Sequence, residues 1–314
     1  DSFTFEGNVS IHLQVLENTQ SVVINSSLLQ ITYSSIKLGD GSSIRPIETL
    51  INETEETVSF IFPEELPKGD AFLSIYFNGT LNDQLKGFYR CEYLDENGEA
   101  RHLATTQFEP TSARMAFPCW DEPSSKATFH VTLTIPSNLT AISNTTIEKE
   151  VRLQGGLKSV CFAKTPIMST YLLAFVVGDL SSIEDKAYDG TVIRVWATRG
   201  KEAQGSFALK TAIKLLEFYN NYFGIPYPLD KLDHIAIPDF AAGAMENWGA
   251  ITYRETALLF DPNNSSKNTQ QRIAEIIAHE MAHMWFGDLV TMDWWDALWL
   301  NESFASWMGN KAVD

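Results

Sequence analysis

Two histidines one helical turn apart, followed by a distant glutamate, constrain the fold of this chain more than any other feature. His279 and His283 lie in the run EIIAHEMAHMWFGD, and Glu302 follows nineteen positions after His283. Apolar residues recur around the histidines at helical spacing: Ile273, Ile276, Ile277 and Met284. We expect Asn268 or Thr269 to cap this helix. Because residues four apart share one face of a helix, the two imidazoles can bind one metal ion.

A zinc ion in a hydrolytic site takes three protein ligands and keeps a fourth position for water, so the two histidines need a partner. Glu302 is the best candidate, because GDLVTMDWWDA can turn the chain and ALWLNESFASWMGN is typical of a second helix with Glu302 near its start. An ordinary acid favoured by the dipole of that helix is the alternative interpretation of Glu302. Glu280 follows His279 directly and points about a quarter-turn away, where a carboxylate can act as general base on water.

The rest of the chain divides into a β-rich part and a mixed part. Apolar residues alternate at Val9, Ile11, Leu13 and Val15, and further strand-like runs are separated by Gly, Pro, Asn and Asp clusters. No long helical period appears before about residue 200. Strand-like TVIRVWA, a helical segment around residues 207–219 and strand-like KLDHIAIP then follow. We therefore predict a multidomain chain with an antiparallel β domain at 1–182 and a mixed α/β domain at 183–314.

HExxH followed eighteen residues later by NE, together with the run from Gly243 to Asn247, resembles the M1 family of zinc aminopeptidases, the gluzincins. Gly243-Ala244-Met245-Glu246-Asn247 matches the G-[AG]-M-E-N signature of that family. The likeness extends through GFYRCEY, TTQFEPTSARMAFPCWDEP and MSTYLLAFVVGDL, and it is greatest to the puromycin-sensitive or oxytocinase-like branch. The resemblance implies that the second domain is the start of a thermolysin-like zinc catalytic domain.

The resemblance also implies roles for residues that their spacing alone does not reveal. Glu246 is expected to bind the substrate's ammonium group, the backbone of Gly243 and Ala244 to align the substrate, and Met245 and Asn247 to complete that binding segment. Taken alone, Glu109 is an exposed acid in a Pro-punctuated loop. In the family the matching loop reaches the catalytic cleft, which makes Gln107 and Glu109 substrate-binding candidates.

These residues together predict a peptidase that removes one residue at a time from a free N-terminus, with one Zn²⁺ held by His279, His283 and Glu302. Glu246 and the metal would measure one residue length between the ammonium group and the first carbonyl. Zinc polarises that carbonyl and lowers the pKa of its water to roughly 7, and Glu280 takes the proton. The family's oxyanion tyrosine lies beyond the second zinc helix, so we expect the chain to be the N-terminal part of a larger enzyme and to be slow by itself.

Three alternatives to an aminopeptidase remain. A zinc endopeptidase would also need HExxH and a distant glutamate, but it has no use for an ammonium-binding GAMEN segment. A lipid epoxide hydrolase of the same superfamily shares these residues and stays open. A non-catalytic peptide-binding module would be expected to carry a damaged zinc motif, whereas the motif here is intact.

Composition excludes some partners and leaves the compartment open. The formal net charge of −17 argues against nucleic acid and anionic membranes as partners, and the longest apolar run, near residues 171–177, is too short to span a bilayer. Three cysteines favour a reducing, cytoplasmic compartment. Glycosylation sequons would instead suit a secreted or lumenal chain: Asn8, Asn25, Asn52, Asn78, Asn138 and Asn144. The sequence does not indicate the oligomeric state or the preferred N-terminal residue.

Overall fold

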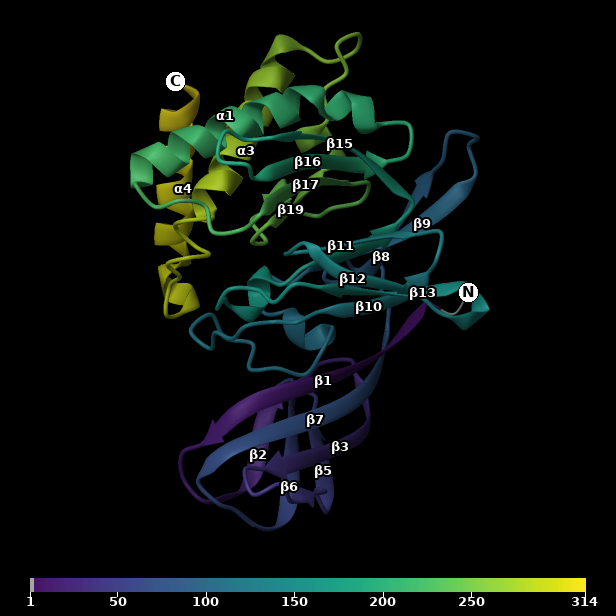
Figure 1. Cartoon of the computed structure of the whole chain (residues 1–314), viewed down its shortest axis with the longest axis vertical. Coiled ribbons are helices and arrows are strands. Elements are labelled where there is room, and N and C mark those ends of the chain that lie inside the picture. The colour runs from purple at the N-terminus through teal and green to yellow at the C-terminus, as the bar shows by residue number, and fades with distance from the viewer. Residues whose placement is uncertain (1–2) are drawn as a thin grey trace.

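The computed structural model describes residues 3–314 and shows three tiers along the long axis of the molecule (Figure 1). An N-terminal β-sandwich forms one end, two further sheets form the middle, and a mixed sheet covered by helices forms the other end. No helix within residues 3–314 is long and apolar enough to cross a membrane.

The N-terminal sandwich consists of two antiparallel sheets that share one apolar core. The first sheet has the strand order β1 (Thr4–Val15), β7 (Gly69–Thr80), β3 (Gln30–Leu38), β4 (Ser43–Ile44). The second has the order β2 (Thr19–Asn25), β6 (Thr57–Leu66), β5 (Glu48–Asn52). Buried and exposed residues alternate along β6 and β7, so each sheet turns one face to the core. The antiparallel β-structure predicted for this part of the chain is confirmed.

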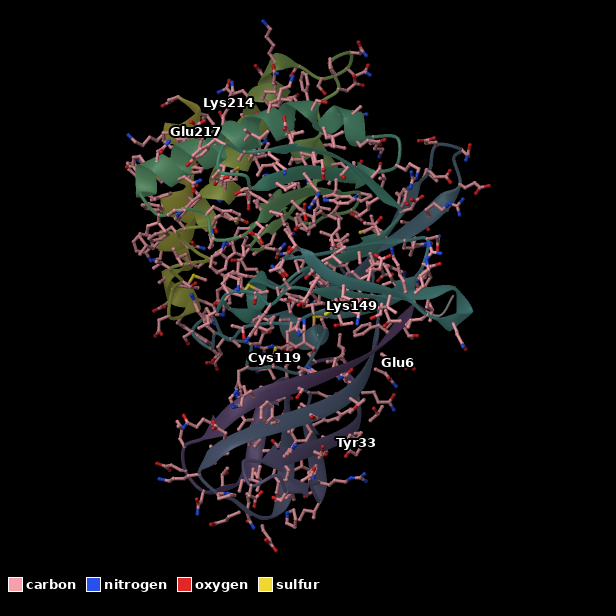
Figure 2. All side chains as sticks on the ribbon, in the orientation of Figure 1. Glu6, Tyr33, Cys119, Lys149, Lys214 and Glu217 are labelled. Atoms are coloured by element: carbon pink, nitrogen blue, oxygen red, sulfur yellow. The ribbon has the colours of Figure 1, made fainter. Side chains whose placement is uncertain are left out.

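Two more antiparallel sheets form the middle tier. One has the order β11 (Thr140–Ser143), β14 (Phe175–Gly178), β9 (Ala100–Gln107), β8 (Gly87–Leu94). The other has the order β10 (Thr132–Pro136), β13 (Leu157–Phe162), β12 (Ile147–Arg152). Cys119, which Figure 2 labels, is buried in the apolar core and packs as a small hydrophobic residue. Of the sequons, Asn144 is buried and its amide donates to the carbonyls of Leu172 and Trp248, so it cannot carry a glycan in the folded chain.

The third tier is a mixed five-stranded sheet with helices packed on it. Its order is β15 (Leu180–Lys186), β16 (Val192–Thr198), β17 (Lys231–Ile237), β19 (Ala250–Arg254), β18 (Ala244–Met245). β16, β17 and β19 run parallel, and the two outer strands run antiparallel to their neighbours. The domain boundary that the sequence predicts, between residues 182 and 183, falls inside β15.

Four α-helices complete this tier: α1 (Ser206–Phe223), α2 (Glu255–Leu258), α3 (Lys267–His283) and α4 (Leu298–Val313). α3 packs against both α1 and α4, which places it at the centre of the helical layer. Ser266 caps α3, because its hydroxyl accepts from the backbone N–H of Thr269. The prediction of Asn268 or Thr269 as the cap was wrong, since both residues already belong to the first turn of the helix.

Buried polar contacts join the middle tier to the mixed sheet. The ammonium of Lys231 donates to the carbonyl oxygens of Ser143 at 2.6 Å and Gly249 at 2.7 Å, and it pairs with Asp233 at 2.7 Å. Tyr89 and Cys91 on β8 both donate to the carbonyl of Asp239. These contacts hold the loop before β18 against the middle tier, so residues from both tiers can meet at one site.

Candidate active site

The three predicted metal ligands lie together where α3 ends and α4 begins. The Nε2 atoms of His279 and His283 are 3.1 Å apart. Glu302 places Oε2 at 3.2 Å from His279 Nε2 and Oε1 at 3.5 Å from His283 Nε2. Zinc ligands at about 2.0–2.2 Å in a tetrahedral arrangement lie about 3.3 Å from one another. The three donor groups therefore have the separations that Zn²⁺ requires.

The ionisation of these groups also suits a metal. Burial lowers the pKa of His283, which favours the neutral imidazole that binds zinc. Burial opposes the charge on Glu302, but the hydrogen bond with His279 and the nearby imidazoles outweigh it and lower the pKa of the carboxyl. Two imidazoles and one carboxylate are a common ligand set of catalytic zinc.

Polar groups behind the histidines fix the direction of each ring. His283 Nδ1 lies 3.1 Å from both the carbonyl oxygen of Phe286 and Oδ1 of Asn301. His279 Nδ1 lies 3.3 Å from Oγ of Ser306. An acceptor at Nδ1 holds the proton there and leaves the lone pair of Nε2 free for a metal.

Sequence analysis did not find these orienting groups. One signal was present, because Ser306 follows Glu302 by one helical turn and so shares its face of α4. The carbonyl of Phe286 left no signal, since its position depends on how the chain turns after α3.

Glu280 lies beside the metal ligands and is buried. Its Oε2 atom has no hydrogen-bond partner within residues 3–314. Burial raises the pKa of Glu280 well above its ordinary value, and the charges of Glu246, Glu302 and Glu109 raise it further. A cavity of about 480 Å³ reaches Glu280 and His279 between α3, α4 and the backbone of Gly243 and Ala244. The carboxylate can therefore meet a water or substrate that enters this cavity.

Two further carboxylates converge on Glu302 from different tiers of the molecule. Oxygen atoms of Glu109, Glu246 and Glu302 all lie within 4.8 Å of one another. The Oε1 atoms of Glu109 and Glu246 are buried, and neither has a hydrogen-bond partner in the described part of the chain. Burial, and then the charge of Glu302, raises the pKa of Glu246 to about 8. Burial, and then the charge of Glu246, also raises the pKa of Glu109 well above its ordinary value. A cation placed among these groups would relieve their repulsion.

Glu109 is not the exposed acid that its sequence position alone suggests. An acid in a Pro-punctuated loop is normally exposed, but one carboxylate oxygen of Glu109 is fully covered. Gln107, at the end of β9, places its Nε2 3.4 Å from the sulfur of Met245. Its Oε1 is buried and unpartnered within residues 3–314. The end of β9 therefore contacts the segment from Gly243 to Asn247.

The segment from Gly243 to Asn247 forms the edge of the mixed sheet. Ala244 and Met245 make up β18, which pairs with β19 on one side. The carbonyl of Gly243 accepts from the backbone N–H of Arg254 at 3.0 Å. An edge strand of this kind can pair with an extended peptide. Asn247 instead donates its amide to Ala250 and Thr252, so its side chain stabilises the turn after Glu246.

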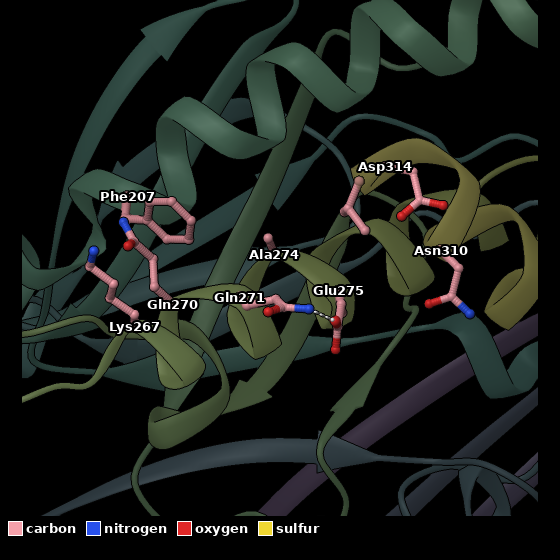
Figure 3. A pocket seen from close by; sticks show the side chains of 9 residues that line it. Phe207, Lys267, Gln270, Gln271, Ala274, Glu275, Asn310 and Asp314 are labelled. Carbon is pink, nitrogen blue, oxygen red and sulfur yellow. Dashed lines mark hydrogen bonds between the residues drawn. The ribbon is translucent and has the colours of Figure 1, made fainter.

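A second hollow, of about 530 Å³, lies between the first turns of α3 and the end of α4 (Figure 3). None of the predicted site residues lines it; Figure 3 shows the hydrogen bond from Gln271 to Glu275, two of its lining residues. His234, which is not among the predicted site residues, is fully buried in β17. Its Nδ1 lies 2.9 Å from the hydroxyl of Tyr253, and burial together with the charge of Lys231 lowers its pKa to about 3.

Two parts of the chain match models of known protein families. Residues 1–172 match the Peptidase M1 N-terminal domain, and residues 207–314 match the Peptidase family M1 domain. The chain belongs to the M1 peptidase family. The resemblance noted from the motifs is thereby confirmed, and so is a β-rich domain followed by the start of the M1 catalytic domain.

Curated M1 relatives match along nearly the whole chain. Aminopeptidase M1 of Arabidopsis thaliana is 49% identical over 99% of this chain and 36% of its own length. Aminopeptidase 2, mitochondrial, of Saccharomyces cerevisiae is 46% identical over 98% of this chain and 32% of its own length. Puromycin-sensitive aminopeptidase of Caenorhabditis elegans is 44% identical over 98% of this chain and 33% of its own length. The chain thus spans about a third of the length of these M1 relatives.

The close packing of α3 and α4 leads to a first prediction, at Gly309. A Cβ atom at Gly309 of α4 would lie 3.0 Å from the backbone nitrogen of His279 on α3. Gly309→Ala is expected to push the helices apart, lower the free energy of unfolding by about 1–3 kcal/mol and weaken zinc binding. Thermal unfolding with and without zinc measures both effects. Equal stability and zinc affinity in the variant would show that the helices do not need this close approach.

Proposed function

We propose that the protein is a zinc aminopeptidase, which removes single residues from the free N-terminus of peptides. The observation that supports this proposal is the convergence of Glu109 and Glu246 on Glu302, with all three carboxylates within 4.8 Å. A peptide ammonium has three N–H donors and one positive charge, which suits two unpartnered carboxylate oxygens beside a metal ligand. The names of the M1 relatives, all aminopeptidases, agree with it.

His279, His283 and Glu302 would hold the zinc ion. When bound, zinc polarises the scissile carbonyl and acidifies a water. Glu280 would accept a proton from water on Oε2, which has no hydrogen-bond partner within residues 3–314, and would deliver it to the leaving amine. The edge of β18 would align the peptide backbone while Glu109 and Glu246 hold the ammonium group, and this would direct the first carbonyl toward His279, His283 and Glu302. A chain that continues on the N-terminal side of the cut would collide with these two residues.

The role of Glu246 gives the second prediction. Glu246→Gln removes the charge from one partner of a charge-assisted contact, which costs about 1.5–3 kcal/mol. We therefore expect kcat/KM for peptides with a free N-terminus to fall roughly 10- to 150-fold in the complete natural protein. Steady-state kinetics on an aminoacyl amide measures this change. Glu109→Gln should have a smaller effect.

The exposed Glu217 on α1, which Figure 2 labels, provides a matched control. Glu217→Gln makes the same chemical change on an exposed side chain outside the candidate site and should leave kcat/KM unchanged. A Glu246→Gln protein that is as active as the Glu217→Gln protein would refute the assignment of the ammonium site. Zinc content must be equal in both variants, because Glu246 lies close to a metal ligand.

A further inference from the structure

A second cluster of metal-binding side chains lies in the middle tier, away from α3 and α4 (Figure 1). The sulfur of Cys161 is 3.1 Å from Nε2 of His130, and the same nitrogen is 3.4 Å from Oε2 of Glu148. One donor atom from each of these residues falls within 4.8 Å of the other two. Such a mixed set of sulfur, nitrogen and oxygen donors differs from an ordinary surface ion pair.

Strand register brings the three residues together. Cys161 on β13 pairs with Thr132 on β10, and the N–H of Phe162 donates to the carbonyl of Val131, which leaves His130 beside Cys161. Val160 and Phe162 are buried while Cys161 is partly exposed, so its side chain lies on the outer face of the sheet.

A β-bulge supplies the third donor. Cys161 pairs with Lys149 on β12, and the register shifts between Ile147 and Lys149, so that Glu148 is the additional residue at this point. Bulges commonly redirect a side chain in this way. Lys149, labelled in Figure 2, marks the place on the sheet where the bulge ends.

The distances fit zinc. With bond lengths of about 2.3 Å to sulfur and 2.0–2.2 Å to nitrogen and oxygen, tetrahedral geometry places S and N about 3.6 Å apart and N and O about 3.3 Å apart. The measured separations of 3.1 Å and 3.4 Å need only small side-chain rotations to reach these values. The side chains of His130 and Glu148 are 55% and 62% exposed, so water can complete the coordination.

We propose that His130, Glu148 and Cys161 form a second zinc site, separate from the one on α3 and α4. A thiolate, an imidazole and a carboxylate together prefer Zn²⁺ over the hard cations Mg²⁺ and Ca²⁺. The bound ion would link β12, β13 and the residues before β10, and so stabilise this sheet. Binding displaces the proton of the Cys161 thiol, which goes to solvent.

The thiol allows this site to be observed by itself. Cys91 and Cys119 are buried, and the ligands on α3 and α4 include no cysteine, so a water-soluble alkylating reagent reports on Cys161. In the reduced, metal-free protein we expect Zn²⁺ at micromolar free concentration to slow alkylation of Cys161 at least tenfold. Cd²⁺ should produce the ultraviolet thiolate-to-metal charge-transfer absorption, and wild-type protein should bind two equivalents of zinc.

Variants distinguish zinc bound by all three residues from zinc bound by the Cys161 thiol alone. Cys161→Ser should bind one equivalent of zinc and show no charge-transfer absorption, while the remaining equivalent shows that the protein is folded. His130→Gln should keep the thiol but lose its protection by zinc. His102→Gln is the matched control, because His102 pairs with Glu92 on the surface without a thiol, at 3.4 Å. Alkylation that zinc does not slow, or protection that survives in His130→Gln, would overturn the proposal.

Discussion

Glu280→Gln is expected to retain zinc and to lower kcat of the complete natural protein by several orders of magnitude. The amide has nearly the same shape as the carboxylate, but it cannot accept the proton of the attacking water. Zinc should remain bound, because Glu280 is not among the three groups that meet at the metal position. Substrate affinity should change little, since Glu109 and Glu246 stay in place.

Metal analysis and single-turnover kinetics of the variant measure these two properties separately. Retention of more than about a tenth of wild-type kcat would exclude Glu280 as the general base. Loss of zinc along with activity would instead make Glu280 part of the metal site. Glu217→Gln again serves as the control, because its exposed carboxylate on α1 is unrelated to the site.

Glu302→Ala is expected to abolish stoichiometric zinc binding at α3 and α4. Removing even a group that only orients a ligand costs about 10- to 100-fold in metal affinity, so loss of the ligand itself should exceed about 100-fold. The two histidines alone leave zinc with an incomplete ligand set. Asp293→Ala, in the exposed segment before α4, should bind zinc like the wild type.

Zinc titration against a competing chelator measures the change, in a Cys161→Ser background so that only one site is counted. The Glu302→Ala protein should hold less than a tenth of an equivalent under conditions in which the Asp293→Ala protein holds one. Equal zinc content in the two proteins would show that Glu302 is an ordinary acid of the first helical turn.

Helix α3 and the common face of its two histidines could be predicted from sequence because the evidence is local. The spacing of His279 and His283 fixes their common face once α3 forms, and the helix is marked by its own apolar residues. Alternation at Val9 to Val15 similarly predicted β1, because the pleat of a strand decides on which side of the sheet each side chain lies. The position of Glu302 followed from the ligand number of zinc.

Residues whose environment depends on distant segments could not be predicted in this way. Glu109 was recognised only through the family resemblance, because its burial depends on the segment around Glu246, more than a hundred residues later. His234 is buried because β16 and β19 flank its strand on both sides, which its local sequence does not reveal. Asn301 orients His283 only because α4 packs on α3. Each outcome was decided by tertiary packing.

The central claim, that the site measures one residue from a free N-terminus, is tested most directly by blocking that terminus. A peptide and its N-acetylated form are incubated with the zinc-loaded complete natural protein, and the products are identified by mass spectrometry. We expect the free peptide to lose single residues in succession and the acetylated peptide to react at least about 100-fold more slowly, since acetylation removes the charge that Glu109 and Glu246 bind. Equal cleavage of both peptides, or cuts at internal bonds, would contradict the account and indicate an endopeptidase.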